Sequence, residues 1–243
     1  MITRSVAAGL ALTLMAVGGA HAEDRGASSD AKALALMAQY RAASGGAALD
    51  RHEAFHETGT IIRDGQAGTY EMYGDLHALR TAGVHTLDGK FGAGGFDGKR
   101  AWHIGPDGEV SITTDPGAVR EAKADAYFTI GGYNWPERFP ATFAYIGVET
   151  YKSKSYDVVR VTPDGATPND LWLDRTTHWL ARITETIAGQ PASADILENR
   201  RVDGTVIGFK SSQIEPGHSM IQTLATYDYV TLDPARLAPP GGK

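Results

Sequence analysis

Hydrophobic and polar residues alternate along most of the chain after residue 54, as in strands that bury one face. The segment 69–76 shows this most clearly, because Tyr70, Met72 and Leu76 fall on one side and Glu71 and Tyr73 on the other. Similar segments, separated by turns rich in Gly, Asp and Pro, predict consecutive hairpins. The predicted strands are 55–63, 69–76, 85–91 with a turn at 88–89, 100–104, 109–112, 143–148, 155–162, 170–173, 180–187, 194–202, 205–213 and 220–232.

Two segments have the sequence features of helices instead of strands. Residues 29–43 carry apolar side chains at helical spacing, with Ser29 or Asp30 as the N-cap and Gly45-Gly46 at the C-terminal end. A second helix begins at Asp115-Pro116 and continues through 119–127, because proline is favoured in the first helical turn. The glycine-rich segment 92–98 nearly matches G-x-G-x-x-G, but it lies between predicted strands and is expected to be a loop.

These elements predict a mainly β, α+β fold. So many consecutive hairpins form a large antiparallel sheet that curls into an open half-barrel, and helices that cover its concave face would close a hydrophobic pocket. No linker or internal repeat divides the chain. We therefore expect a single domain over residues 23–236, followed by a disordered tail at 237–243.

The first 22 residues have the pattern of a secretory signal peptide. Arg4 supplies the positive charge, 6–17 is a run of apolar and small residues, and Ala20-His21-Ala22 is an A-x-A cleavage site. The alternative is an uncleaved membrane anchor, but the apolar run is shorter than the about 20 residues that a spanning helix needs. The sequence thus predicts a periplasmic or secreted protein.

Composition narrows the classes of function further. The chain has no cysteine, which excludes disulfides, thiolate metal sites, a cysteine nucleophile and a lipid-bearing cysteine. Its formal net charge is −6, and the longest basic run is the pair Arg200-Arg201, so a nucleic-acid partner is not expected. No motif for a cofactor is present, and we predict none.

One motif points to metal chemistry. Residues 52–56 match H-E-x-x-H, in which a helix places His52 and His56 on one face to hold zinc while Glu53 activates a water. However, the strand-forming residues that follow favour an extended segment, in which two histidines four residues apart lie about 13 Å apart and cannot share an ion. A zinc-dependent hydrolase therefore remains an alternative that requires a helix over residues 50–57.

Three segments, taken in order, resemble one known family. They are 95–102 (GFDGKRAW), 171–182 (LWLDRTTHWLAR) and 201–207 (RVDGTVI), after the helix that ends at Gly45-Gly46. Together they resemble the outer-membrane lipoprotein carrier superfamily of LolA/LolB-like proteins, over nearly the whole chain after the leader. The subgroup that the chain resembles has this domain ahead of a retropepsin-like aspartic protease. The catalytic Asp-Thr-Gly or Asp-Ser-Gly of such proteases is absent here.

The resemblance implies an unclosed barrel with helical lids that binds acyl chains, and a non-catalytic carrier of a lipid or an acylated protein. The residues expected to line the hollow or form its lid are Tyr70, Met72, Leu76, Trp102, Ile104, Tyr133, Trp135 and Phe139. These side chains would equally serve as ordinary core, since buried aromatics pack helices onto sheets in many proteins. A further alternative is an envelope sensor or scaffold that binds a protein partner along the same sheet.

Overall fold

A computed structural model describes residues 29–187 and 189–238, so the predicted leader and most of the predicted tail lie outside the described residues. Within them, the strands form one antiparallel sheet. Its first half contains β1 (Ala54–Arg63), β2 (Gln66–Asp75), β3 (Arg80–Leu87), β4 (Lys90–Phe96), β5 (Ala101–Ile104) and β6 (Val110–Thr113). Its second half contains β7 (Ala141–Tyr151), β8 (Lys154–Pro163), β9 (Asn169–Asp174), β10 (Leu180–Ile187), β11 (Gln190–Val202), β12 (Thr205–Glu215) and β13 (His218–Val230).

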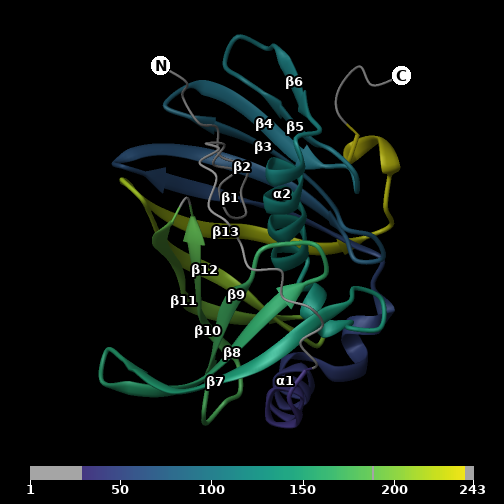
Figure 1. The fold of residues 1–243 in the computed structure, drawn as a ribbon. Helices are drawn as coiled ribbons and strands as arrows, with labels where there is room; N and C mark the ends of the chain where they lie inside the picture. The colour runs from purple at the N-terminus through teal and green to yellow at the C-terminus, as the bar shows by residue number, and fades with distance from the viewer. Residues whose placement is uncertain (1–28, 188, 239–243) are drawn as a thin grey trace.

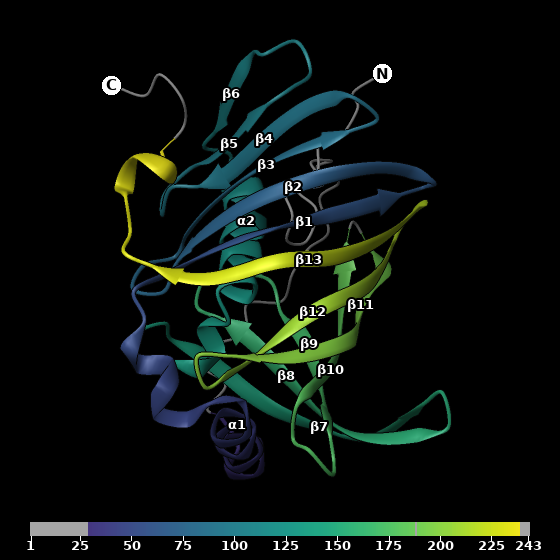
Figure 2. The same ribbon diagram turned by 180° about the vertical axis from the view of Figure 1, so that it is seen from behind.

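The two halves are joined where the first strand meets the last. The strand order is β6-β5-β4-β3-β2-β1-β13-β12-β11-β10-β9-β8-β7, so each half is a run of hairpins and β1 pairs with β13. The outer strands β6 and β7 do not pair with each other, and the sheet stays open. It curls around helix α2, which lies in front of the sheet in Figure 1 and behind it in Figure 2. The predicted mainly β fold with a curled, open antiparallel sheet is confirmed.

Helix α1 (Ala31–Ser44) closes one end of the hollow. Asp30 is its N-cap and accepts a hydrogen bond from the Ala33 amide at 2.6 Å, while Gly45, at a φ of 144°, provides the C-cap. The second Asp30 carboxylate oxygen accepts from the amide of Tyr145, which ties the helix start to β7. A 3-10 helix, η1 (Gly46–Arg51), then leads from α1 into β1.

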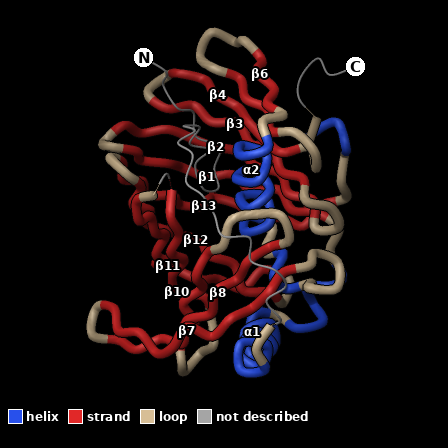
Figure 3. The backbone as a smooth tube through the Cα atoms, viewed as in Figure 1, coloured by secondary structure: helices blue, strands red, loops and turns tan. Residues whose placement is uncertain are grey.

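Helix α2 (Pro116–Thr129) lies across the concave face (Figure 3). The helix begins at Pro116, as predicted, and Asp115 caps it by accepting a hydrogen bond from the Ala118 amide at 3.0 Å. Small side chains allow it to approach the sheet closely, because Ala122 and Ala126 pack against Phe96 and Ala101. A 3-10 turn, η2 (Gly132–Asn134), follows, and the chain then passes through Trp135 and Phe139 to β7.

The prediction was wrong for residues 92–98. The turn at Asp88-Gly89 joins two complete strands, and β4 extends to Phe96. Glycine is needed in β4 because neighbouring side chains cross it: a Cβ on Gly92 would lie 2.5 Å from the His85 ring, and a Cβ on Gly95 would lie 2.9 Å from the Trp102 ring. A run of glycines can therefore mark either a loop or a strand whose backbone is closely approached by neighbouring side chains.

The sheet buries residues on both faces. The inner cluster unites α1, α2 and both halves of the sheet and includes Tyr70, Met72, Tyr127 and Phe143. A smaller outer cluster contains Trp102, Ile104 and Leu237, where the segment after β13, with the 3-10 turn η3 (Pro234–Arg236), folds back over the outer face. Leu237 is only 1% exposed. The packed chain thus extends past residue 236, where the sequence placed the end of the domain.

Candidate ligand-binding cavity

A cavity of about 250 Å³ lies between the inner face of the sheet, the α1–η1 segment and the end of α2. Its lining is apolar and aromatic apart from a few polar groups, as is usual for small-molecule sites. Among the lining residues are Tyr40, Leu49, Phe55, Glu57, Leu76, Phe128, Ile130, Tyr133, Trp135, Trp179, Ile183, Ile196, Ile207, Tyr227 and Tyr229.

Aromatic side chains of β1 and β13 form the sheet wall of the cavity. The rings of Phe55 and Tyr227 stack with centroids 5.2 Å apart, and Tyr229 meets Tyr227 edge-on at 5.4 Å. These contacts follow from the pairing of β1 with β13, which places Phe55 opposite Tyr229 and Glu57 opposite Tyr227. The wall therefore depends on two strands from opposite ends of the chain.

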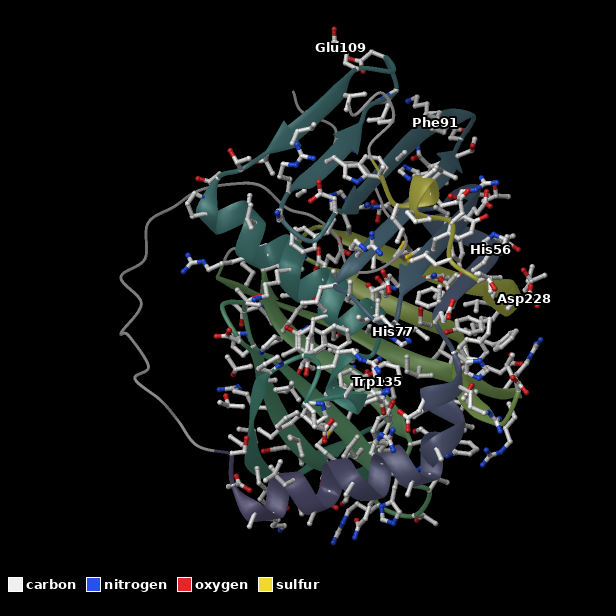
Figure 4. The ribbon with its side chains drawn as sticks, turned by 90° about the vertical axis from the view of Figure 1, so that its right-hand side faces the viewer. His56, His77, Phe91, Glu109, Trp135 and Asp228 are labelled. Atoms are coloured by element: carbon white, nitrogen blue, oxygen red, sulfur yellow. The ribbon has the colours of Figure 1, made fainter. Side chains whose placement is uncertain are left out.

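The opposite wall is the segment that follows α2, held down by a polar contact that we call the Asp50 latch. Asp50 accepts hydrogen bonds from the Trp135 indole at 2.8 Å and from the Arg41 guanidinium at 2.7 Å. Arg41 also donates to the Asn134 carbonyl at 2.9 Å. The Arg41 hydrogen bonds hold the pKa of Asp50 below its ordinary value, so the latch is charged at neutral pH. Trp135, labelled in Figure 4, thus connects the cavity wall to the α1–η1 segment.

Glu57 is a buried carboxyl that lines the cavity. It is 7% exposed, and burial raises its pKa from 4.5 to about 8. The neighbouring Tyr70 hydroxyl lowers this pKa, and it offsets only part of the effect of burial. Glu57 therefore carries its proton at neutral pH.

The residues predicted to bind ligand fall into three groups. Leu76, Tyr133 and Trp135 line the cavity. Tyr70, Met72 and Phe139 belong to the same inner cluster and pack behind the lining.

Trp102 and Ile104 lie in the outer cluster with Leu237 and do not face the cavity. The reason is the side-chain alternation of β5: Ala101 faces α2, so Trp102 must point to the other face of the sheet.

The sequence analysis missed much of the lining. Phe55 and Glu57 on β1, and Tyr227 and Tyr229 on β13, contribute to the sheet wall. Strand alternation could have identified these residues in part, because Phe55 and Glu57, like Tyr227 and Tyr229, lie two residues apart and therefore share a face of the sheet. The pairing that brings both strands together joins segments about 170 residues apart, which local patterning does not specify.

The H-E-x-x-H segment does not form the helix that zinc binding requires, because β1 begins at Ala54. His52 stacks on Tyr229 with ring centroids 3.5 Å apart. His56 instead lies 2.9 Å from the Glu71 carboxylate and stacks on Tyr73. In residues 29–187 and 189–238, no three His, Cys, Asp or Glu side chains come together as metal ligands would.

In the described part of the chain, no helix combines the length and apolar character needed to cross a membrane. No family model matches the sequence, and no curated protein matches it either. Solved structures do match. A LolA superfamily protein from Nitrosomonas europaea superposes with a TM-score of 0.57 at 10% identity, over 85% of this chain and 97% of that one. The chain has a LolA-like fold.

Two other structures support the LolA-like fold. A DUF1329 family protein from Desulfovibrio piger gives a TM-score of 0.55 at 12% identity, over 85% of this chain and 97% of that one. A putative outer-membrane lipoprotein-sorting protein domain from Vibrio parahaemolyticus gives a TM-score of 0.54 at 11% identity, over 82% of this chain and 93% of that one. The likeness covers 82–85% of this chain, and it is a likeness of fold.

Proposed function

We propose that this chain is a non-catalytic binding or carrier protein for a lipid or an acylated ligand, working in the periplasm or outside the cell after cleavage behind Ala22. The observation that supports it is the cavity itself: an apolar, aromatic-lined space on the inner face of an open sheet with a LolA-like fold. Each acyl methylene buried there contributes about 0.8 kcal/mol of binding free energy. Sequestration needs no catalytic group.

The size of the cavity suggests how a ligand enters. Its volume of about 250 Å³ lies just below the usual range for small-molecule sites, roughly 300–1,000 Å³. A whole lipid therefore requires the wall formed by η2 and Trp135 to move outward. The Asp50 latch suits such movement, because a half-exposed ion pair stabilises the closed position only weakly.

A variant that fills the cavity tests this function. Val206 lines the cavity and is partly exposed, so Val206→Trp places an indole in the space that an acyl chain would occupy. Native mass spectrometry of the protein titrated with monopalmitoylglycerol should show a 1:1 complex for the wild type. We expect the variant to lose at least roughly tenfold in affinity, because a filled pocket cannot bury the chain.

Val84→Trp is the matched control. Val84 is also a strand valine, is 38% exposed and lies outside the cavity lining, so its replacement should leave the affinity unchanged. Binding that both tryptophan variants reduce equally, or that neither reduces, would place the lipid elsewhere on the protein. No binding by the wild type would reject the carrier function.

A further inference from the structure

Glu57 differs from everything else that lines the cavity. Among residues 29–187 and 189–238, no Lys, Arg, His or Asp lines the cavity, and Glu57 is the single carboxyl group that does. Its strand position places it opposite Tyr227 of β13 and Met72 of β2, on the inner face of the sheet. A carboxyl group in such a place is costly unless it has a use or a partner, because buried polar groups need hydrogen bonds.

The groups around Glu57 leave it with unused hydrogen-bonding capacity. The titratable side chains that interact with it are tyrosines, Tyr70 on β2 and Tyr227 on β13. From the α2 side, the lining contributes Phe128, Tyr133 and Trp135, which carry no charge at neutral pH. The Tyr70 hydroxyl lies near enough to Glu57 to lower its pKa, but it is buried and makes no hydrogen bond of standard geometry to Glu57 or to any other described residue. A neutral carboxyl here offers one O–H donor toward the cavity.

We propose that Glu57 is a specificity-determining residue that donates a hydrogen bond to the carbonyl oxygen of an acyl ester or acyl amide in the cavity. This inference rests on the proposed function and adds the chemical class of the ligand. An uncharged carbonyl needs no cation from the protein, and no Lys, Arg or His of the described chain lines the cavity. A carboxylate ligand would be buried without a positive partner, which is unfavourable.

A pair of ligands that differ only at the carbonyl tests this inference. Monopalmitoylglycerol is an ester, and 1-O-hexadecylglycerol is the corresponding ether without the carbonyl. At pH 7 the wild type should bind the ester roughly fivefold more tightly, the value of one neutral hydrogen bond. Glu57→Leu should remove that preference while ether binding remains. Glu57→Gln should keep it, because the amide N–H also donates.

Glu185→Leu is the control. Glu185 on β10 is a half-buried carboxyl, and loss of solvent raises its pKa to about 7, but it does not line the cavity. The ester preference should survive in this variant. Raising the pH from 7 to 9 should reduce the preference in the wild type, because Glu57 then loses the proton that it donates.

The outcomes separate the two proposals. Equal binding of ester and ether by the wild type, or an ester preference that persists in Glu57→Leu, would overturn the role of Glu57 and leave the carrier function standing. Failure of the wild type to bind either ligand would overturn both. Ester binding that strengthens with rising pH would show that an ionised carboxylate acts there, and would also overturn the inference.

Discussion

At the scale of single residues, buried carboxyls give this protein an unusual dependence on pH. The pKa of Glu57 is raised to about 8 and that of Glu185 to about 7, in both cases mainly by burial. Their ordinary value is 4.5, so at neutral pH the folded protein holds protons that the unfolded chain has lost. Wherever the folded state binds more protons, stability falls as the pH rises.

Glu57 is not the only carboxyl that can titrate between pH 7 and 8. Glu185, with a pKa of about 7, still holds part of its proton at pH 7, and burial raises the pKa of Asp125 well above 3.8, whereas His85, whose pKa is lowered to about 4, has already deprotonated. We expect the free energy of unfolding of the wild type, from urea titrations, to fall by roughly 1 kcal/mol across this interval. Glu57→Gln should remove more of this decrease than Glu185→Gln does, because Glu57 loses more of its proton in this interval. If the free energy of unfolding falls equally with pH in the wild type and in Glu57→Gln, Glu57 is already ionised at pH 7.

At the residue scale, prediction from the sequence succeeded for residues whose contacts lie close to them along the chain. Asp30 and Asp115 cap their helices as their positions indicate, because a cap contacts amides three residues away. Glu57 was not identified, since burial that shifts a pKa comes from side chains far away in sequence. Trp102 and Ile104 were placed on the wrong face of the sheet for the same reason: alternation shows which residues share a face, but not which face is inner.

At the scale of elements, we propose that the segment after α2 acts as a lid whose closed position depends on the Asp50 latch. The latch joins Arg41 of α1 to the indole of Trp135 through one carboxylate. Arg138 adds a hydrogen bond to the Leu76 carbonyl at 2.6 Å. Side chains of two elements thus hold the lid, and a change at Asp50 should alter the rate of ligand exchange more than the fold.

Asp50→Asn tests the latch. It removes the charge and one acceptor for Arg41, so monopalmitoylglycerol should transfer to vesicles roughly two- to fivefold faster, as expected for an exposed ion pair. Stopped-flow measurement of the transfer rate provides the readout. Asp170→Asn is the matched control, because Asp170 makes a comparable bidentate pair with Arg160 on β8 and β9, remote from the lid. The same rate in all three proteins would mean that the latch does not control exchange.

Prediction of the strands failed in the glycine-rich segment, because glycine occurs both in loops and in strands that neighbouring side chains approach closely. Residues 92–98 were expected to be a loop, yet Gly92 and Gly95 lie in β4 and give room to His85 and Trp102. The sequence contains both partners, but their approach depends on pairing between three strands. Most other strands were found within a few residues, because alternation and turn residues are local signals.

At the scale of the molecule, an open sheet uses its two faces differently. The inner face holds the cavity and the segment after α2 that lines it, whereas the outer face of β3–β5 is covered by the chain around Leu237. The sequence predicted the curled antiparallel sheet from its hairpins. It did not predict that β1 pairs with β13, because local patterning does not specify which strands from opposite ends of the chain pair.

The measurement that tests the central claim most directly is a native mass spectrum of the protein purified gently from the periplasm of cells that express the full chain. We predict an adduct of lipid mass at 1:1 stoichiometry, which is lost in Val206→Trp and retained in Val84→Trp. A wild-type spectrum that shows only the bare protein, and stays bare after incubation with acyl lipids, would contradict the account.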